Sequence, residues 1–276
     1  MICFVCFVVE YKFMPKWKLV IEYEGTRYRG WQEQANVRTI QGELRKASEA
    51  FLGNEVEIVG SGRTDAGVHA LHQVAHLRSI KSVRAAYLRQ EINDRLPADI
   101  NIREVQEVPA RFHARHHAEE RYYLYQIATQ RSAFGKHFVW WIKDRLDVHS
   151  MIGAARLFIG MRDFAAYREK AEDPQSTLVN VTRCEVAVHG DLILVRISAS
   201  HFLWKMVRRI VGVLAEVGRG NLEPQRVNHL TAAEIARWTA PPSGLFLEYV
   251  RYPNEAPPGS ILPAFIFRQQ NSEEKP

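Results

Sequence analysis

The sequence predicts an α+β fold made of two ferredoxin-like lobes, each with the order β-α-β-β-α-β, and a central cleft. Three observations support it. Some stretches alternate apolar and polar residues with the period of a strand, and others repeat apolar residues at helical spacing. The order of these stretches then begins again after residue 118 of the 276. A split β-α-β order that occurs twice is typical of paired ferredoxin-like lobes.

The first lobe begins with a strand over Trp17–Glu24, where Trp17, Leu19, Ile21 and Tyr23 alternate with polar residues. This alternation indicates one buried face. A helix follows, where Ile40, Leu44, Ala47 and Phe51 recur at helical spacing. The remaining elements are a helix over 40–51, strands over 55–59 and 73–78, a helix over 83–95 and a strand over 100–105.

The second lobe follows a connection over 109–118 and repeats the order with additions. His189-Gly190-Asp191 between two apolar stretches predicts a turn, because glycine is the usual residue at such sites. We therefore place the first lobe at residues 15–112 and the second at 113–270. The second contains strands over 121–128, 182–188, 192–198 and 245–252 and helices over 149–159, 202–217 and 231–240.

Residues 1–14 do not fit either lobe. Their apolar run, Ile2–Val9, has no basic residues before it, and it is shorter than the roughly 20 residues of a membrane span. We expect a tail, or a start assigned too early with Met14 as the true start, and no membrane association.

Composition indicates a globular protein with a polyanionic partner. Thirty-seven Lys and Arg against 31 Asp and Glu give a net charge of +6, which favours nucleic acid over an acidic protein. The three cysteines are too scattered for a disulfide framework. This indicates a reducing compartment, and we expect the cytoplasm.

One glycine-rich segment, Gly60–His69, lies between two predicted strands and is the candidate site for chemistry. It is no Walker A loop, because Val68-His69 stands where Lys-Ser/Thr would be, and Asp65 replaces the third glycine of a dinucleotide fingerprint. Arg63 precedes Asp65 by two residues, and a nearby cation favours an ionised carboxylate that can act as nucleophile or base. By spacing alone, a surface Arg-Asp pair that caps a turn is the favoured interpretation.

The run GRTDAGVHA at Gly62–Ala70 resembles the signature of the TruA family of tRNA pseudouridine synthases. Further matches follow in family order between Trp17 and Pro253, nearly the whole chain. Ser200-His201 departs from the small pair that the family often has before Phe202-Leu203. The matches are IEYEGT (21–26), GWQ (30–32), NVRTIQ (36–41), QVAH (73–76), LPADI (96–100), FHAR (112–115), RYYLY (121–125), DF (163–164), FLWKMVR (202–208) and GLFL (244–247).

The resemblance implies an isomerase that converts uridine to pseudouridine in the anticodon stem-loop of tRNA, at positions 38, 39 and 40, as a homodimer whose two subunits both contact one tRNA. It implies no cofactor and no metal. By residue-by-residue matching, Asp65 is the catalytic residue and Arg63 helps to displace the target base. The substrate-binding matches are Tyr123 (or Tyr125) against the base, Arg208 paired with the aspartate, and Leu245 (or Leu247) in the apolar pocket wall.

Two other functions compete with this one. A catalytically silent RNA-binding module would share the basic charge, but an acid in an RNA-facing loop gives it no advantage. A metal-dependent nuclease would use Asp65 with His69, His72 and His76, yet we expect a loop and a strand to separate these histidines. We expect a basic connector with a solvated or RNA-facing surface at His113, His116 and His117, and core or subunit-contact roles in preference to RNA contact for Trp140 and Trp141. The exposed loop expected at Arg27-Tyr28-Arg29 fits RNA contact and plain solvation equally.

Overall fold

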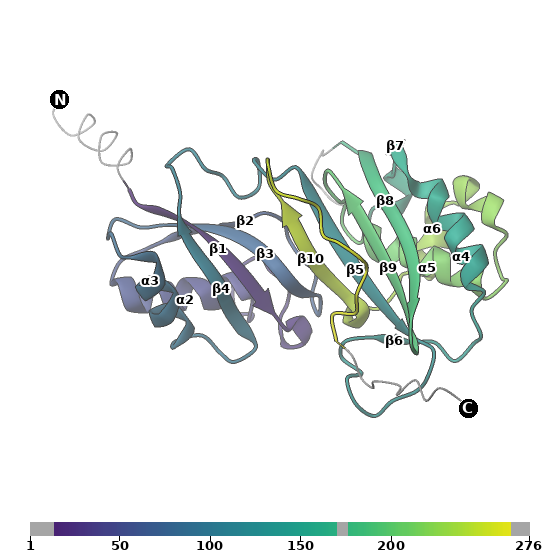
Figure 1. The fold of residues 1–276 in the computed structure, drawn as a ribbon, viewed down its shortest axis with the longest axis horizontal. Coiled ribbons are helices and arrows are strands. Elements are labelled where there is room, and N and C mark those ends of the chain that lie inside the picture. The colour runs from purple at the N-terminus through teal and green to yellow at the C-terminus, as the bar shows by residue number, and fades with distance from the viewer. Residues whose placement is uncertain (1–13, 170–175, 266–276) are drawn as a thin grey trace, which may run out of the picture. The chain divides into compact units, whose positions relative to one another are not determined.

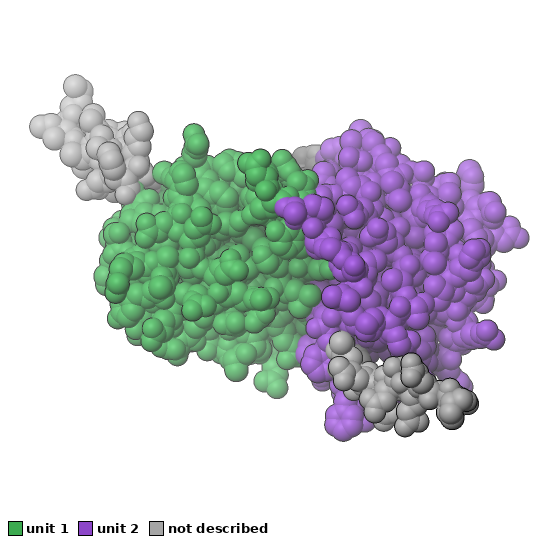
Figure 2. Space-filling model, viewed as in Figure 1, with its two compact units in different colours: residues 1–119, 247–255 green, residues 120–246, 256–276 purple. Residues whose placement is uncertain are grey.

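The computed structural model describes residues 14–169 and 176–265 (Figure 1). The proposed N-terminal tail, apart from Met14, and the end of the chain from residue 266 lie outside these residues. The chain forms two compact units, coloured separately in Figure 2. The described residues up to Glu119 and Leu247–Glu255 form the first unit, and those in Glu120–Phe246 and from Ala256 onward form the second.

The first unit has the predicted β-α-β-β-α-β order. Its antiparallel strands are arranged β4-β1-β3, and β2 pairs with part of β3. Helices α2 and α3 pack against each other next to this sheet (Figure 1). The elements are β1 (Lys16–Tyr23), α2 (Ile40–Leu52), β2 (Glu57–Gly60), β3 (His69–Arg78), α3 (Ala85–Asn93) and β4 (Ile100–Glu107), with a 3-10 turn at Gly25–Arg27.

Local signals explain these boundaries. Trp17, Leu19 and Ile21 of β1 are fully buried, as their alternation predicted. The Thr39 hydroxyl accepts a hydrogen bond from the Gly42 N–H and begins α2, and Gly53 ends it at a positive φ of 73°. The predicted helix start at 40 is therefore confirmed.

The second unit has an antiparallel sheet ordered β5-β9-β8-β7, with the short strand β6 parallel to β5. Helix α5 packs against both α4 and α6 (Figure 1). The elements are β5 (Glu120–Ala128), β6 (Trp140–Trp141), α4 (Val148–Ala155), β7 (Gly160–Asp163), β8 (Leu178–His189), β9 (Leu192–Ala199), α5 (Met206–Gly218) and α6 (Ala232–Arg237), with 3-10 turns at Arg156–Phe158, Ala165–Tyr167, Pro224–His229 and Pro242–Gly244. The last strand, β10 (Leu245–Arg251), has only its first two residues in this unit.

Several predicted boundaries change. Helix α5 begins at Met206 and not at Phe202, because Lys205 before it has a left-handed φ of 61°. Helix α6 begins after Thr231, whose side chain forms a capping box with Glu234. The sequence placed the last strand in the second lobe. Instead, β10 lies next to β3, so its residues from Leu247 belong to the first unit, and the units divide after Glu119 where the sequence divided the lobes after Phe112.

Candidate active site

The glycine-rich segment forms the loop between β2 and β3, and its first turn is fixed to β3. The Ser61 N–H donates to the Val74 carbonyl (2.7 Å), and the Ser61 hydroxyl donates to Gln73 Oε1 (2.8 Å). The Gln73 amide in turn donates to the Gly62 carbonyl (3.1 Å). Ser61 and Gln73 are both buried, so water does not compete for these bonds.

The middle of the loop is fixed by Thr64, which is buried. Its hydroxyl shares a hydrogen bond with the Tyr23 hydroxyl (2.8 Å), and its carbonyl accepts the Trp31 N–H (3.0 Å). Burial raises the pKa of the Tyr23 phenol well above its ordinary value, so the phenol keeps its proton at neutral pH. Two distant segments of the first unit therefore hold the residue between Arg63 and Asp65.

The end of the loop lies directly against the segment after β1. A Cβ added to Gly25 would lie 1.9 Å from the Val68 carbonyl oxygen, and one added to Gly30 would lie 2.5 Å from the Thr64 carbonyl oxygen. Gly30 also has a positive φ of 93°. The Gly25 N–H donates to His69 Nδ1 (3.1 Å). Only glycine fits these approaches of backbone to backbone.

This supporting role of Gly25 and Gly30 was not predicted from the sequence, where both residues stand within the family matches without an assigned function. Two glycines that bracket a short segment after a strand are the available signal, because such glycines mark close backbone approach.

Tyr28, between these glycines, corrects another expectation. The sequence placed it in an exposed loop, but its side chain is buried, with 3% of its surface exposed. Its hydroxyl donates to Asp99 Oδ1, and the Arg38 guanidinium lies over its ring at 4.6 Å from the centroid. Its carbonyl accepts the Gly67 N–H (3.3 Å). Arg27 and Arg29 are exposed as expected.

Arg63 and Asp65 are accessible on either side of the buried Thr64. Arg63 is exposed and Asp65 is partly exposed, and the Asp65 carbonyl accepts the Val68 N–H (3.2 Å) in the turn. Fixed backbone with accessible Arg and Asp side chains is the arrangement that a preorganised catalytic carboxylate requires.

In the second unit, the geometry distinguishes the two tyrosines that the sequence left open. Tyr125 is fully buried, and its hydroxyl donates to the Pro241 carbonyl (2.8 Å). Tyr123, one strand period earlier on β5, keeps 8% of its surface exposed, and its ring meets the ring of Phe202 edge to face at 5.1 Å and 88°. Tyr123 is therefore the better candidate to meet a base.

The other two matched positions also lie in the second unit. Arg208 is in the first turns of α5, where its Nε donates to the Ala240 carbonyl (2.7 Å) and its carbonyl accepts the Ala240 N–H (3.0 Å). Leu245 begins β10 and is buried, as is its alternative Leu247. The pairing of Arg208 with Asp65 that the resemblance implies stays a prediction.

The three histidines of β3 each contact another residue of the first unit. His69 accepts the Gly25 N–H and, contrary to expectation, begins β3 and does not lie in the loop. His72 stacks on Tyr249 at 4.5 Å between ring centroids, and His76 Nδ1 accepts the Ala114 N–H (3.2 Å). Across the part of the chain that the structure describes, no group of three His, Cys, Asp or Glu side chains could hold a metal ion.

His76 should make the stability of the protein depend on pH. It is 1% exposed, and burial, with smaller contributions from Lys16, His113 and Arg78, lowers its pKa to about 3. An unfolded histidine titrates near 6.5, so the unfolded chain binds the extra proton between pH 6.5 and 3 and stability falls as pH falls through this range. From pH 6.5 to 4 we expect a loss of about 3 kcal/mol from this group.

Urea unfolding of the wild type and of His76→Gln at pH 6.5, 5.5 and 4 measures this effect. Glutamine keeps an acceptor for the Ala114 N–H and does not titrate, so the variant should have the flatter pH dependence. Equal pH slopes for the two proteins would mean that His76 can take up a proton in the folded state.

The comparisons with known proteins show the family of the chain. A family model described as tRNA pseudouridine synthase matches residues 19–117 and 154–253. A tRNA pseudouridine synthase A 2 of Bacillus cereus (strain ZK / E33L) is 37% identical over 245 residues, which cover 87% of this chain and all of that one. A tRNA pseudouridine synthase A of Citrifermentans bemidjiense is 39% identical over 241 residues, covering 85% and 96% of the two chains. A solved Cbf5-Nop10-Gar1 complex has a chain with a TM-score of 0.30 and 12% identity over 72% of this chain and 54% of that one, too remote to bear on the site.

Proposed function

Because the chain belongs to the tRNA pseudouridine synthase family, whose members are isomerases of uridine in tRNA, we propose that it acts on the anticodon stem-loop, at positions 38, 39 and 40, with Asp65 as its catalytic residue. The relatives that it matches are named tRNA pseudouridine synthase A, which supports this specificity. The observation that carries the proposal is the β2–β3 loop, where Ser61 and Thr64 are buried and bonded while Arg63 and Asp65 stay accessible.

The reaction explains why these residue types are needed. The enzyme breaks the glycosidic bond of uridine, turns the base and joins it again through carbon, so the base must first leave its stack at a cost of a few kcal/mol. In our proposal, Arg63 takes the vacated space and contacts phosphate, and Tyr123 packs on the displaced base. Arg208 pairs with the Asp65 carboxylate, and Leu245 forms the apolar wall of the base pocket. The step that Asp65 performs can be attack on the sugar, attack on the base or removal of a proton.

The direct test is incubation with an unmodified tRNA transcript, followed by mapping of pseudouridine at single-nucleotide resolution. We expect product in the anticodon stem-loop, without an added cofactor and with EDTA present. Product confined to another arm would contradict the specificity, and loss of activity in EDTA would contradict the metal-free reaction.

We also propose that the enzyme is a homodimer of the cytoplasm and that one tRNA contacts both subunits. None of the helices within residues 14–169 and 176–265 combines the length and the apolar character of a membrane span. Analytical ultracentrifugation with and without tRNA measures both the dimer and its RNA stoichiometry.

Tyr123 should matter more for turnover than for tRNA binding. Because its ring packs against Phe202, truncation to alanine would leave a cavity, so we choose Tyr123→Leu, which keeps most of the volume and removes the π-face. Stacking on one aromatic ring is worth about 1–3 kcal/mol, so the single-turnover rate should fall about tenfold, while the Kd for tRNA stays within about threefold. Tyr123→Phe keeps the ring and should be near wild type in both. A large loss of affinity in Tyr123→Leu would instead assign the ring to the fold.

A further inference from the structure

The second unit displays a loop over residues 129–145, between β5 and α4, that has no part in the proposed reaction. We call it the basic loop. It contains four cations, Arg131, Lys136, Lys143 and Arg145, and a single acid, Asp144. All four cations are exposed.

The basic loop is anchored at several points, so its display of side chains is built into the fold. The Thr129 N–H and hydroxyl both donate to the Asp191 carbonyl (2.9 Å each). The Ile142 N–H donates to the Ala128 carbonyl (3.0 Å), and the Val139 carbonyl accepts the Ser243 hydroxyl (3.1 Å). Val139 and Ile142 are buried beneath the loop.

The two adjacent tryptophans point in opposite directions, as successive residues of a strand do. Trp140 lies edge to face against Tyr125 at 6.3 Å, whereas Trp141 is 41% exposed. The Arg131 guanidinium lies over the Trp141 ring at 5.5 Å from its centroid. Lys143 is exposed two residues after Trp141, with the buried Ile142 between them, so both belong to the outward face.

A second ring is held at the tip of the loop. The Phe138 N–H donates to the Gly135 carbonyl (2.8 Å), and Gly135 has a positive φ of 64°. This turn places Phe134 outside the unit, with 81% of its side chain exposed. Phe134 and Trp141 are thus two large aromatic side chains exposed on the same loop as its four cations.

The charge of the loop indicates the chemistry of this partner. Asp144 is paired with Arg219 (2.8 Å), and among the described residues none of the four cations of the loop forms a salt bridge. Positive charge that the described residues leave without a salt bridge, interleaved with exposed aromatic rings, matches RNA, whose phosphates bind the cations and whose unpaired bases stack on the rings.

We propose that the basic loop is a second RNA-binding surface of this enzyme, where Arg131 and Lys143 hold phosphates and Trp141 and Phe134 stack on unpaired bases of the tRNA, away from the uridine that reacts. This inference rests on the proposed function in that the RNA is the substrate tRNA. The surface contributes affinity and not chemistry.

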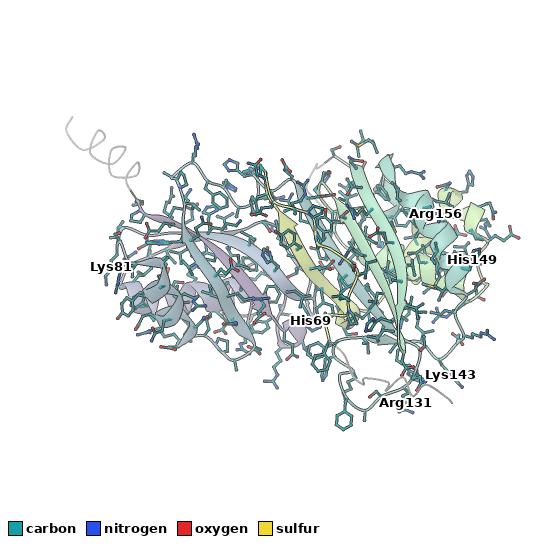
Figure 3. The ribbon with its side chains drawn as sticks, in the orientation of Figure 1. His69, Lys81, Arg131, Lys143, His149 and Arg156 are labelled. Atoms are coloured by element: carbon teal, nitrogen blue, oxygen red, sulfur yellow. The ribbon has the colours of Figure 1, made fainter. Side chains whose placement is uncertain are left out.

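The test compares two double variants that each remove one Arg and one Lys. Arg131→Ala/Lys143→Ala removes charge from the basic loop. The matched control, Arg156→Ala/Lys81→Ala, removes exposed charge elsewhere, and Figure 3 shows Arg156 near α4, apart from Arg131 and Lys143. The Kd for a tRNA transcript is measured by filter binding at several salt concentrations, and the single-turnover rate is measured at saturating enzyme.

For the loop variant we expect a Kd raised about tenfold or more and a log–log salt slope smaller by about 1.5, because each phosphate contact adds about 0.7–0.9 to the slope. The rate at saturation should stay within twofold, and the control should bind within twofold of wild type. Trp141→Ala and Phe134→Ala should each raise Kd about tenfold with the salt slope unchanged.

A loop variant that binds tRNA as well as the control would overturn the inference. The inference would also be overturned if the loop variants became monomeric in ultracentrifugation while each monomer kept its affinity for tRNA. The loop would then be a contact with a second copy of this chain. Failure of the proposed function can be distinguished from failure of this inference. A wild-type protein that binds tRNA but forms no pseudouridine would contradict the proposed function, and the Kd values of the variants could still be compared.

Discussion

Replacing Asp65 with alanine should lower the rate of pseudouridine formation by more than about a thousandfold, equivalent to about 4 kcal/mol of transition-state stabilisation. The loop that holds Asp65 is bonded to the rest of the first unit through Ser61, Thr64 and Gly67, and Asp65 itself is partly exposed. The substitution removes the reactive group and leaves the bonds of Ser61, Thr64 and Gly67 in place. The melting temperature should stay within about 2 °C, as for surface substitutions in general.

Affinity separates a catalytic role from a binding role for Asp65. The Kd for tRNA should stay within about tenfold of wild type, or become smaller, because a negative charge that faces phosphates is gone. Asp94→Ala, which removes an exposed carboxylate at the end of α3, is the matched control and should react at the wild-type rate. A folded Asp65→Ala protein that forms pseudouridine at a near-native rate would refute the catalytic assignment.

Local patterns in the sequence were sufficient to predict most of the fold. Trp17, Leu19 and Ile21 recur with the period of a strand, and the apolar residues from Ile40 recur with the period of a helix. In both elements the face that these residues share is the face that the structure buries. The turn at Gly190, with a φ of 56°, follows from the backbone preference of glycine alone. Order and type of element are local properties, so the β-α-β-β-α-β order of the first unit was predictable.

What could not be predicted depends on contacts between distant segments. The left-handed Lys205 that delays α5 is a conformation that lysine rarely adopts, and no neighbouring residue signals it. Leu247 belongs to the first unit because β10 lies next to β3, and the apolar pattern of a strand does not specify which strand it pairs with. The burial of Tyr28 depends on Asp99, which follows it 71 residues later in the sequence.

Some residues of the candidate site could likewise be predicted from the sequence, and others could not. The chemical residues Arg63 and Asp65 stand in one short string, so the resemblance could identify them from the sequence. The residues that position them lie outside this string, because Tyr23, Trp31 and Gln73 bind the loop from other segments of the first unit. A carboxylate is effective only where such neighbours fix its position, which makes the supporting contacts part of the catalytic design.

Replacing Gly25 with alanine should therefore impair stability and activity together. The added Cβ would lie 1.9 Å from the Val68 carbonyl oxygen and 2.6 Å from its carbon, and because these are backbone atoms no side-chain rotation relieves the clash. The segment after β1 and the catalytic loop must move apart, which strains the bond from the Gly25 N–H to His69. We expect a loss of about 3 kcal/mol, as in overpacked cores, and a melting temperature lower by about 6–12 °C. A displacement of about 1 Å at the loop should also slow turnover about a hundredfold.

Gly153→Ala is the control, because a Cβ at this position in α4 meets no atom within 4 Å and alanine favours a helix by about 1 kcal/mol over glycine. Its melting temperature should rise slightly and its turnover should not change. Calorimetry and the single-turnover rate, measured on both variants below their melting temperatures, test the link between support and chemistry. If Gly25→Ala had a lowered melting temperature but a wild-type turnover rate, the segment after β1 would stabilise the unit without positioning Asp65. The carboxylate would then have kept its position although the supporting segment had moved.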